Sequence, residues 1–282
     1  MSIRLFLILG LALLSVSTTS LVVRHLALVP AVVIAFWRMF TASAMLWSYS
    51  AVKPSGKLSL ENRVPIILAG VFLGSHFATF FASVRLTSIA SATLLGCLAP
   101  FFTSILEWLS GKKLKERVVT GLSLSLFGAF ILQLTPSSTE NVSSGNFLAI
   151  ASSLFMALTW FQAKKIRKNT NTVVYGRTLF FVSSVTIFLV IFFTKESVFN
   201  FSSGTFIWFL FLGFVPSILG HNLLNYSIRY ISATSVSSVV LGEPIIASVL
   251  GYFIFGEKIP ESFWIGGPLI LTGLYYLLNS KN

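Results

Sequence analysis

Charged residues are scarce in this sequence. Asp, Glu, Lys and Arg make up 10% of the 282 residues, whereas 55% are hydrophobic and the mean hydropathy is +0.87. A soluble domain of this length needs roughly 25% charged residues to cover its surface. The shortage excludes a soluble globular protein and indicates an integral membrane protein that contacts the lipid bilayer.

Several signatures of chemistry are also missing. A single cysteine, Cys97, excludes an intramolecular disulfide and a thiol pair for redox work or zinc. The three histidines, His25, His76 and His221, lack the spacing of metal ligands, and neither a phosphate-binding glycine loop nor a nucleophile elbow is present. We therefore predict no enzyme activity, no cofactor and no metal. The net charge of +12 does not require a nucleic acid partner, because cytoplasmic loops of membrane proteins are rich in Lys and Arg.

Long apolar runs are present instead. A membrane-spanning helix needs about 20 apolar residues. The sequence predicts ten such spans, at 3–23, 29–50, 64–84, 89–110, 118–135, 146–163, 172–194, 205–228, 232–255 and 262–279. The runs are too long for barrel strands, so the expected fold class is an all-α membrane protein. The first run is longer than the apolar part of a signal peptide, and we expect an uncleaved first helix.

The Lys and Arg residues outside these spans are unevenly distributed. With the N-terminus in the cytoplasm, fourteen of them fall in inside segments, and the outside segments hold Arg24, Arg85, Lys195 and Lys258. This bias predicts a multi-pass protein of the inner or plasma membrane with both termini in the cytoplasm.

The two halves of the chain resemble each other. The stretch "SVRLTSIASATLLGCLAP" (83–100) matches "SIRYISATSVSSVVLGEP" (227–244) at an offset of 144, with Pro100 opposite Pro244. We predict one repeat at 1–139 and a second at 140–282. Each holds five spans, an odd number, so the second copy must enter the membrane from the opposite side. Inverted repeats of this kind recur in secondary transporters, where one pathway opens to either side in turn.

At this point the chain resembles the EamA type of the drug/metabolite transporter superfamily. The most specific stretch is "LGEPIIASVLGYFIFGEKIPESFWIGGPLILTG" (241–273), with a proline in the ninth span and a glycine-rich tenth span. The first half departs from this pattern, since Ala99 stands opposite Glu243 and Lys112 opposite Glu257. The resemblance implies ten helices in two inverted five-helix repeats and transport of small metabolites, often amino acids, by alternating access.

Two ionisable residues are predicted deep in the bilayer. Glu243 lies about 16 Å and Arg38 about 13 Å into their spans, at roughly 1.5 Å per residue. A charge there costs at least about 2.5–3.5 kcal/mol, so both must face protein or water. Glu243 could hold a substrate ammonium or a proton, or it could bond to a neighbouring helix. Arg38 could clamp a carboxylate or phosphate, or it could pair within the protein. Arg177 lies nearer the cytoplasmic loop, where it could bind substrate or extend toward water.

Further polar and aromatic residues are candidates for lining a cavity. They are His76, His221, Asn222, Asn225 and Tyr226, of which the last three share one helix face, together with Trp37, Trp160 and Tyr175 beside other polar positions. Bonding between helices, or an aromatic belt at the membrane interface, would explain them equally. Pro100 and Pro244 predict helix kinks. Gly121, Gly128, Gly266 and Gly273 predict close packing, and they leave a homodimer open. Glu107, near the end of its span, is expected to be solvated.

These residues together predict a secondary or facilitative transporter. Its substrate would bind between the halves, and an anion-binding Arg38 with an acidic Glu243 suits a zwitterion such as an amino acid, with protons as a coupling ion. A carrier of nucleotides, sugar phosphates or S-adenosylmethionine and a multidrug exporter remain alternatives on the same fold. A membrane enzyme or a channel is a more distant alternative, because neither clustered catalytic groups nor a selectivity filter is visible.

Overall fold

The computed structural model describes residues 2–279 apart from 88, 133–142, 257–258 and 260, so the predicted repeat boundary at 139/140 lies outside the described residues. In the described residues the chain is helical. The elements are α1 (Ile3–His25), α2 (Ala31–Val52), η1 (Leu60–Asn62), α3 (Arg63–Leu86), α4 (Ile89–Gly96), α5 (Ala99–Leu109), α6 (Glu116–Leu132), α7 (Ser143–Ile166), α8 (Thr172–Thr194), η2 (Ser203–Thr205), α9 (Phe206–Leu212), η3 (Gly213–Asn222), α10 (Leu223–Ser227), α11 (Ala233–Val239), η4 (Val240–Gly242), α12 (Glu243–Phe255) and α13 (Phe263–Leu278).

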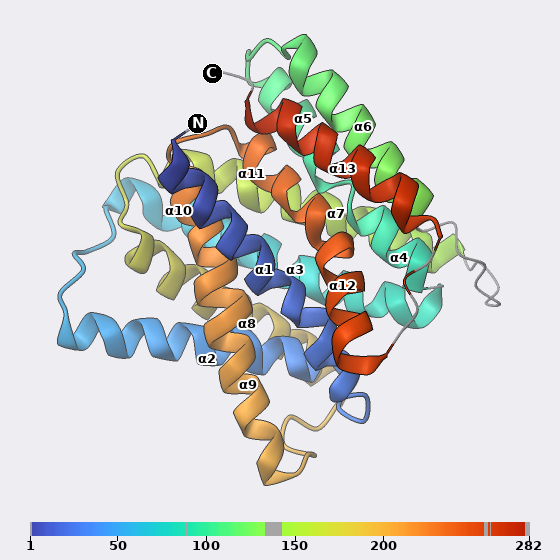
Figure 1. Ribbon diagram of the computed structural model, residues 1–282. Coiled ribbons are helices and arrows are strands. Elements are labelled where there is room, and N and C mark those ends of the chain that lie inside the picture. Colours follow the sequence, from blue (N-terminus) through green and yellow to red (C-terminus); the bar gives the residue numbers. More distant parts are fainter. Residues whose placement is uncertain (1, 88, 133–142, 257–258, 260, 280–282) are drawn as a thin grey trace.

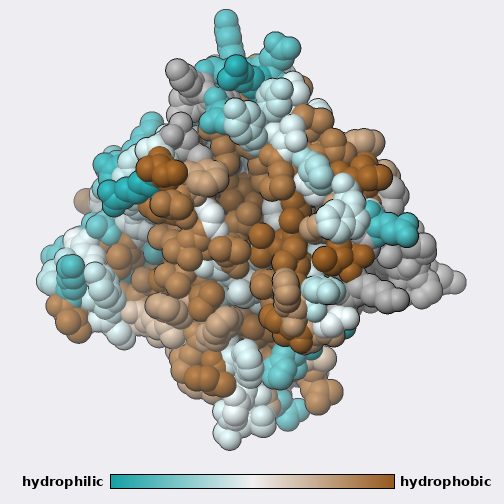
Figure 2. All heavy atoms as spheres, viewed as in Figure 1, coloured by the Kyte–Doolittle hydropathy of each residue, from teal (hydrophilic) through white to brown (hydrophobic). Residues whose placement is uncertain are grey.

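These elements form the ten predicted spans. Seven spans are single helices: α1, α2, α3, α6, α7, α8 and α13. The other three are interrupted, and consist of α4 with α5, of α9 with η3 and α10, and of α11 with η4 and α12. Large apolar side chains are exposed over much of the surface, and Figure 2 shows them as a broad band with hydrophilic residues toward the margins. A bilayer would cover this band, and the prediction of a ten-helix all-α membrane protein is confirmed.

The neighbours of each helix reveal the repeat. Helix α3 packs on α7, and their counterparts five spans away, η3 with α10 and α1, pack on each other as well. The pairs α2 with α8, α6 with α13 and α5 with α11 each join one span to its own counterpart. This set of contacts is what a two-fold relation between the halves requires. Because each half has an odd number of spans, the two copies cross the membrane in opposite directions.

The repeated glycines lie between α6 and α13, which run side by side in Figure 1. A Cβ atom on Gly121 would come within 2.8 Å of the Gly273 carbonyl oxygen, and one on Gly128 within 2.7 Å of the Gly266 oxygen. Real Cβ atoms do not approach so closely, so glycine is needed on both helices. The close packing predicted from these glycines therefore occurs inside one chain.

The two matched prolines open the second half of an interrupted span. Pro100 lies in the first turn of α5, after a turn at Cys97 and Leu98, and Pro244 lies in the first turn of α12, after η4. A proline in the first turn of a helix lacks only an N–H that would have no helical partner. Both interruptions are therefore compatible with their sequences and occupy equivalent positions.

The interruption in the eighth span was not expected, since the sequence predicts one continuous helix there. The η3 segment is a π-helix that contains Pro216, which has no N–H to donate. The hydroxyl of Ser217 donates instead to the Leu212 carbonyl oxygen, at 2.9 Å. The wider turn changes the direction of the side chains that follow it, and π-helical turns of this kind are frequent at functional sites.

Figure 1 shows the start of α1 and the end of α13 at the same end of the bundle, which we call the N-terminal end. The opposite end, where α1 and α12 finish, we call the distal end.

Candidate substrate cavity

A cavity of about 470 Å³ lies between the two repeats. Its walls come from α1, α2, α3, the turn between α4 and α5, α7, η3 and the ninth span. It extends from the middle of the bundle to the distal end, because its lining includes Arg24 in the last turn of α1 and Gly251 near the end of α12. Five of the predicted candidates line it: Arg38, His76, Trp160, His221 and Glu243.

Arg38 is the deep cation of this cavity and is only 4% exposed. Its Nε donates to the hydroxyl of Ser217, at 3.0 Å, and its guanidinium carbon lies 5.1 Å from the centre of the Phe77 ring. Its Nη2 is buried and has no hydrogen-bond partner within the described part of the chain. An unsatisfied buried donor costs about 1–3 kcal/mol, and more when it is charged. The protein thus binds the guanidinium at Nε, and the Nη2 donor is available to a ligand.

Glu243 is the first residue of α12 and lines the same cavity. The start of a helix favours a negative charge, because the first backbone N–H groups point toward it. Among the described residues, no Lys or Arg nitrogen lies within 4 Å of the Glu243 carboxylate, and none of the hydrogen bonds found there includes it. Arg38 and Glu243 therefore face the same cavity without forming a direct ion pair with each other.

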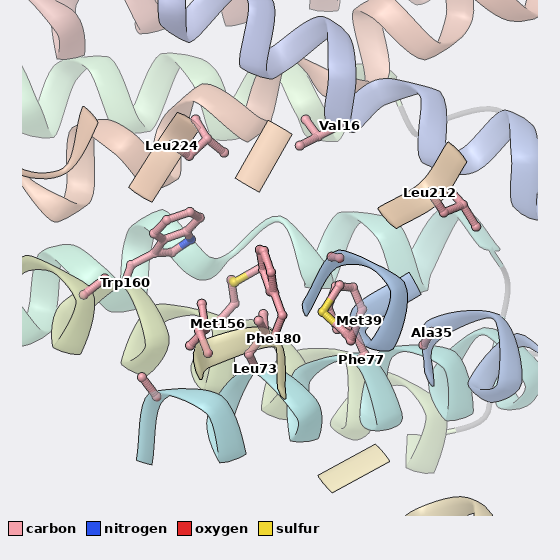
Figure 3. Packing of buried hydrophobic residues seen from close by; sticks show 14 of the residues in the cluster. Val16, Ala35, Met39, Leu73, Phe77, Met156, Trp160, Phe180, Leu212 and Leu224 are labelled. Atoms are coloured by element: carbon pink, nitrogen blue, oxygen red, sulfur yellow. The ribbon is translucent and has the colours of Figure 1, made fainter. Parts of the chain in front are cut away.

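Aromatic groups supply much of the remaining wall. The ring of His221 stacks on Trp160, with centroids 6.2 Å apart and an angle of 14° between the planes. Nδ1 of His76 lies 2.9 Å from the Ser152 hydroxyl and 3.0 Å from the Ser152 carbonyl oxygen, which fixes the ring on α7. Figure 3 shows the apolar side chains nearby, with Met156 and Trp160 of α7 facing Val16 of α1. The cavity thus combines two residues of opposite charge with a largely apolar surface.

Six other predicted candidates are not among the residues that line this cavity. Trp37 donates from Nε1 to the Val198 carbonyl oxygen, at 3.0 Å, and stacks on Phe209 within an aromatic cluster. The guanidinium carbon of Arg177 lies 4.2 Å from the centre of the Trp47 ring, on the side of the loop that follows α2. Both residues pack against protein away from the cavity.

The predicted polar face of the eighth span also turns away. A Cβ atom on Gly176 of α8 would lie 2.5 Å from Oδ1 of Asn222, so this amide points at α8. Tyr175 of α8 is fully buried, and its hydroxyl has no hydrogen-bond partner among the described residues. The Asn225 carbonyl oxygen accepts from Nε of Arg167, and Tyr226 is bonded to Tyr230. None of these four side chains is therefore among the residues that line the cavity.

Sequence reasoning overlooked two residues that line the cavity, Cys97 and Phe77, and one that accepts a hydrogen bond from Arg38, Ser217. Cys97 lies at the turn between α4 and α5, and Phe77 lies under the Arg38 guanidinium. Ser217, which holds Arg38, precedes His221 by one helical turn, so a search for polar residues at that spacing would have found it. Phe77 offered no such signal, because it is one of 28 phenylalanines.

The expectation that Glu107 is solvated is wrong. The residue is 4% exposed, and its carboxylate accepts from the backbone N–H groups of Ala233 and Thr234 at the start of α11. The Thr234 hydroxyl and Lys112 also donate to it. Hydropathy placed Glu107 near a span end, but its burial depends on α11, a partner from the other repeat.

Comparisons with known proteins agree with this architecture. The EamA-like transporter family matches residues 2–134 and again residues 143–279. An uncharacterized transporter of Archaeoglobus fulgidus is 28% identical over 197 residues, which cover 70% of each chain. The uncharacterized transporter YwfM of Bacillus subtilis is 26% identical over 246 residues, which cover 85% of this chain and 81% of the relative.

A solved crystal structure superimposes with a TM-score of 0.84 and covers 97% of this chain and 96% of its own, at 17% identity. At that identity the likeness concerns the fold alone.

Proposed function

Since the chain belongs to the EamA-like transporter family, it is a membrane transporter, and we propose that its cargo is a small zwitterionic metabolite of the amino-acid type. The observation that carries the proposal is the pairing of Arg38 and Glu243, two opposite charges that line one cavity without contacting each other. Burying either charge alone is costly, and a ligand with both charges would satisfy the two residues at once.

The roles of the two residues follow from their chemistry. Nη2 of the Arg38 guanidinium has no partner among the residues that the structure describes, and a carboxylate is the group that such a planar fork binds best. The Glu243 carboxylate would accept from the ammonium group of the same molecule. Trp160 and His221 would pack against the remainder of the substrate. A cavity of about 470 Å³ is at the small end of the roughly 300–1,000 Å³ seen for ligand pockets, which suits a small metabolite.

The lining charges disfavour a cargo with several phosphates. Among the described lining residues the cations are Arg24, at the distal opening, and Arg38, and Glu243 would repel a polyanion. S-adenosylmethionine contains an amino-acid group that could contact the same two charged residues. It would differ from a simple amino acid in its larger size. A multidrug exporter would not need the guanidinium.

We propose that transport follows alternating access. The cavity reaches the distal end and lies between two halves that can exchange conformations. The sequence contains no ATP-binding motif, so a gradient of the substrate or of protons would drive the movement, with Glu243 as the proton-carrying group. The distribution of Lys and Arg supports a cytoplasmic N-terminal end in an inner or plasma membrane.

Competition in proteoliposomes tests the cargo class. Radiolabelled amino-acid mixtures are offered to the purified protein, and each active amino acid is competed with its decarboxylated amine and its deaminated acid. Because a hydrogen bond to a charged group is worth about 1.5–3 kcal/mol, each analogue should compete about 10- to 150-fold more weakly. Equal competition by either analogue would contradict the proposal. Arg177→Lys serves as a control, because Arg177 lies outside the cavity.

A further inference from the structure

The two repeats are joined at the N-terminal end by one buried carboxylate. Glu107 lies near the end of α5 in the first repeat, and its oxygens accept from two backbone N–H groups of α11 in the second. The distances are 3.3 Å from the Ala233 nitrogen to Oε1 and 3.3 Å from the Thr234 nitrogen to Oε2, and the Thr234 hydroxyl donates to Oε2 at 2.7 Å.

These bonds complete the start of α11. The first N–H groups of a helix have no partner inside the helix, and Ser232 satisfies one of them by accepting from the Ser235 nitrogen at 3.0 Å. Glu107 satisfies two more, and its negative charge is favourable at that helix end. Lys112, which follows α5, donates to the same carboxylate from a side chain that is half exposed. Separating α5 from α11 would break the bonds from Ala233 and Thr234, whereas Lys112 would stay with Glu107 and Ser232 with Ser235.

The distal end lacks an equivalent closure. Under the relation between the repeats, the pair α5 and α11 corresponds to the pair α12 and α4. In the part of the chain that the structure describes, α5 packs along α11, whereas α12 and α4 do not make a comparable contact. The cavity opens at that distal end, past Arg24 and Gly251. The structure therefore combines a closed N-terminal end with an open distal end.

The sequence explains why the two ends differ. The offsets of 144 and 145 between the repeats place Gly251 or Tyr252 opposite Glu107. Neither residue carries a carboxylate, so the position equivalent to Glu107 in the second repeat cannot bond to the start of α4 in the same way. If the halves exchanged conformations, the closed distal end would not gain the bonds that Glu107 makes.

We propose that Glu107 is a one-sided latch that holds the N-terminal end closed and favours the state open at the distal end. The inference rests on the alternating access proposed above, but not on the identity of the cargo. Lys164 donates to the Ile228 and Ile231 carbonyl oxygens, at 2.8 and 2.7 Å, within the second repeat. Those bonds can persist when the halves move, whereas the bonds of Glu107 cross between the halves and must break.

The native Cys97 provides the test, because it is the single cysteine and lines the cavity. Full-length protein is reconstituted in vesicles of both orientations, and protease removal of an N-terminal tag identifies which face is exposed. A membrane-impermeant methanethiosulfonate is then applied to each face, and the rate of Cys97 modification is measured by mass spectrometry. In the wild-type protein, the reagent should modify Cys97 fast from the distal face and slowly from the N-terminal face.

The latch variants should change the side of access. In Glu107→Ala the ratio of N-terminal-face to distal-face rates should rise at least about tenfold, because all three bonds across the repeats are lost and a single hydrogen bond to a charged group is worth about that factor. Thr234→Val removes one of the bonds and should give a smaller rise in the same direction. Glu116→Gln is the matched control, because Glu116 is exposed at the same end of the bundle and its loss should leave the ratio unchanged.

The latch would be overturned if Glu107→Ala and Thr234→Val kept the wild-type ratio of Cys97 modification rates while their melting temperatures showed that both variants were folded. If Glu107→Ala does not fold, Thr234→Val decides alone. Failure of the proposed cargo would look different: amino-acid uptake would be absent in the wild type while the labelling ratio still changed in the variants.

Discussion

Replacing Glu243 by glutamine separates the two explanations of a buried carboxylate. Glutamine keeps the shape of the side chain and removes the negative charge. If Glu243 binds a substrate ammonium, its negative charge destabilises the substrate-free protein, because no cation lies within 4 Å of it among the described residues. Glu243→Gln should then leave the melting temperature unchanged or raise it.

The same change should weaken the binding of the cargo. Loss of one hydrogen bond between charged partners removes about 1.5–3 kcal/mol, which is about 10- to 150-fold in the substrate concentration needed for half-maximal exchange. Substrate exchange across proteoliposomes measures this without a proton gradient. If Glu243 also carries the coupling proton, uptake driven by a pH gradient should lose its pH dependence.

If Glu243 instead has a structural role, the melting temperature should fall and substrate exchange should be unaffected. A carboxylate that bonds neighbouring helices would lose stability on replacement while exchange stayed normal. A lower melting temperature together with wild-type exchange in Glu243→Gln would therefore refute the assignment of Glu243 to the substrate site.

Two further predictions concern the scaffold. Gly273→Ala places a Cβ atom 2.2 Å from Oγ of Ser125 and 2.5 Å from the Gly121 oxygen, so it should lower the unfolding free energy by about 1–3 kcal/mol. Gly10→Ala, with nothing within 4 Å, should raise it by about 0.5–1 kcal/mol, and equal melting temperatures for these variants would contradict the packing of α6 on α13. Trp37→Phe removes the bond to the Val198 carbonyl oxygen and should cost about 1 kcal/mol in thermal unfolding with unchanged substrate affinity. If Trp37→Phe lost as much substrate affinity as Glu243→Gln, Trp37 would have to be part of the substrate site.

Neighbouring residues show where sequence reasoning succeeds and where it stops. Arg38 and Glu243 could be found because ionisable groups are costly in a bilayer wherever they point. Trp37 and Arg38 are adjacent, yet one packs in an aromatic cluster and the other faces the cavity. Consecutive side chains on a helix point about 100° apart, and the sequence does not state which direction leads to the cavity. The same ambiguity placed Asn222 in the cavity by expectation and against α8 in the structure.

The order of amino acids is enough to predict the ten spans, the duplication and the helix interruptions at Pro100 and Pro244. Lipid imposes a fixed length on every apolar run, and proline and glycine constrain the backbone wherever they occur. Which polar residues meet depends on how the helices pack. The π-helical turn directs His221 to Trp160, and the crossing of α5 with α11 buries Glu107. Contacts between distant segments depend on how helices rotate and cross, and hydropathy carries no information about either.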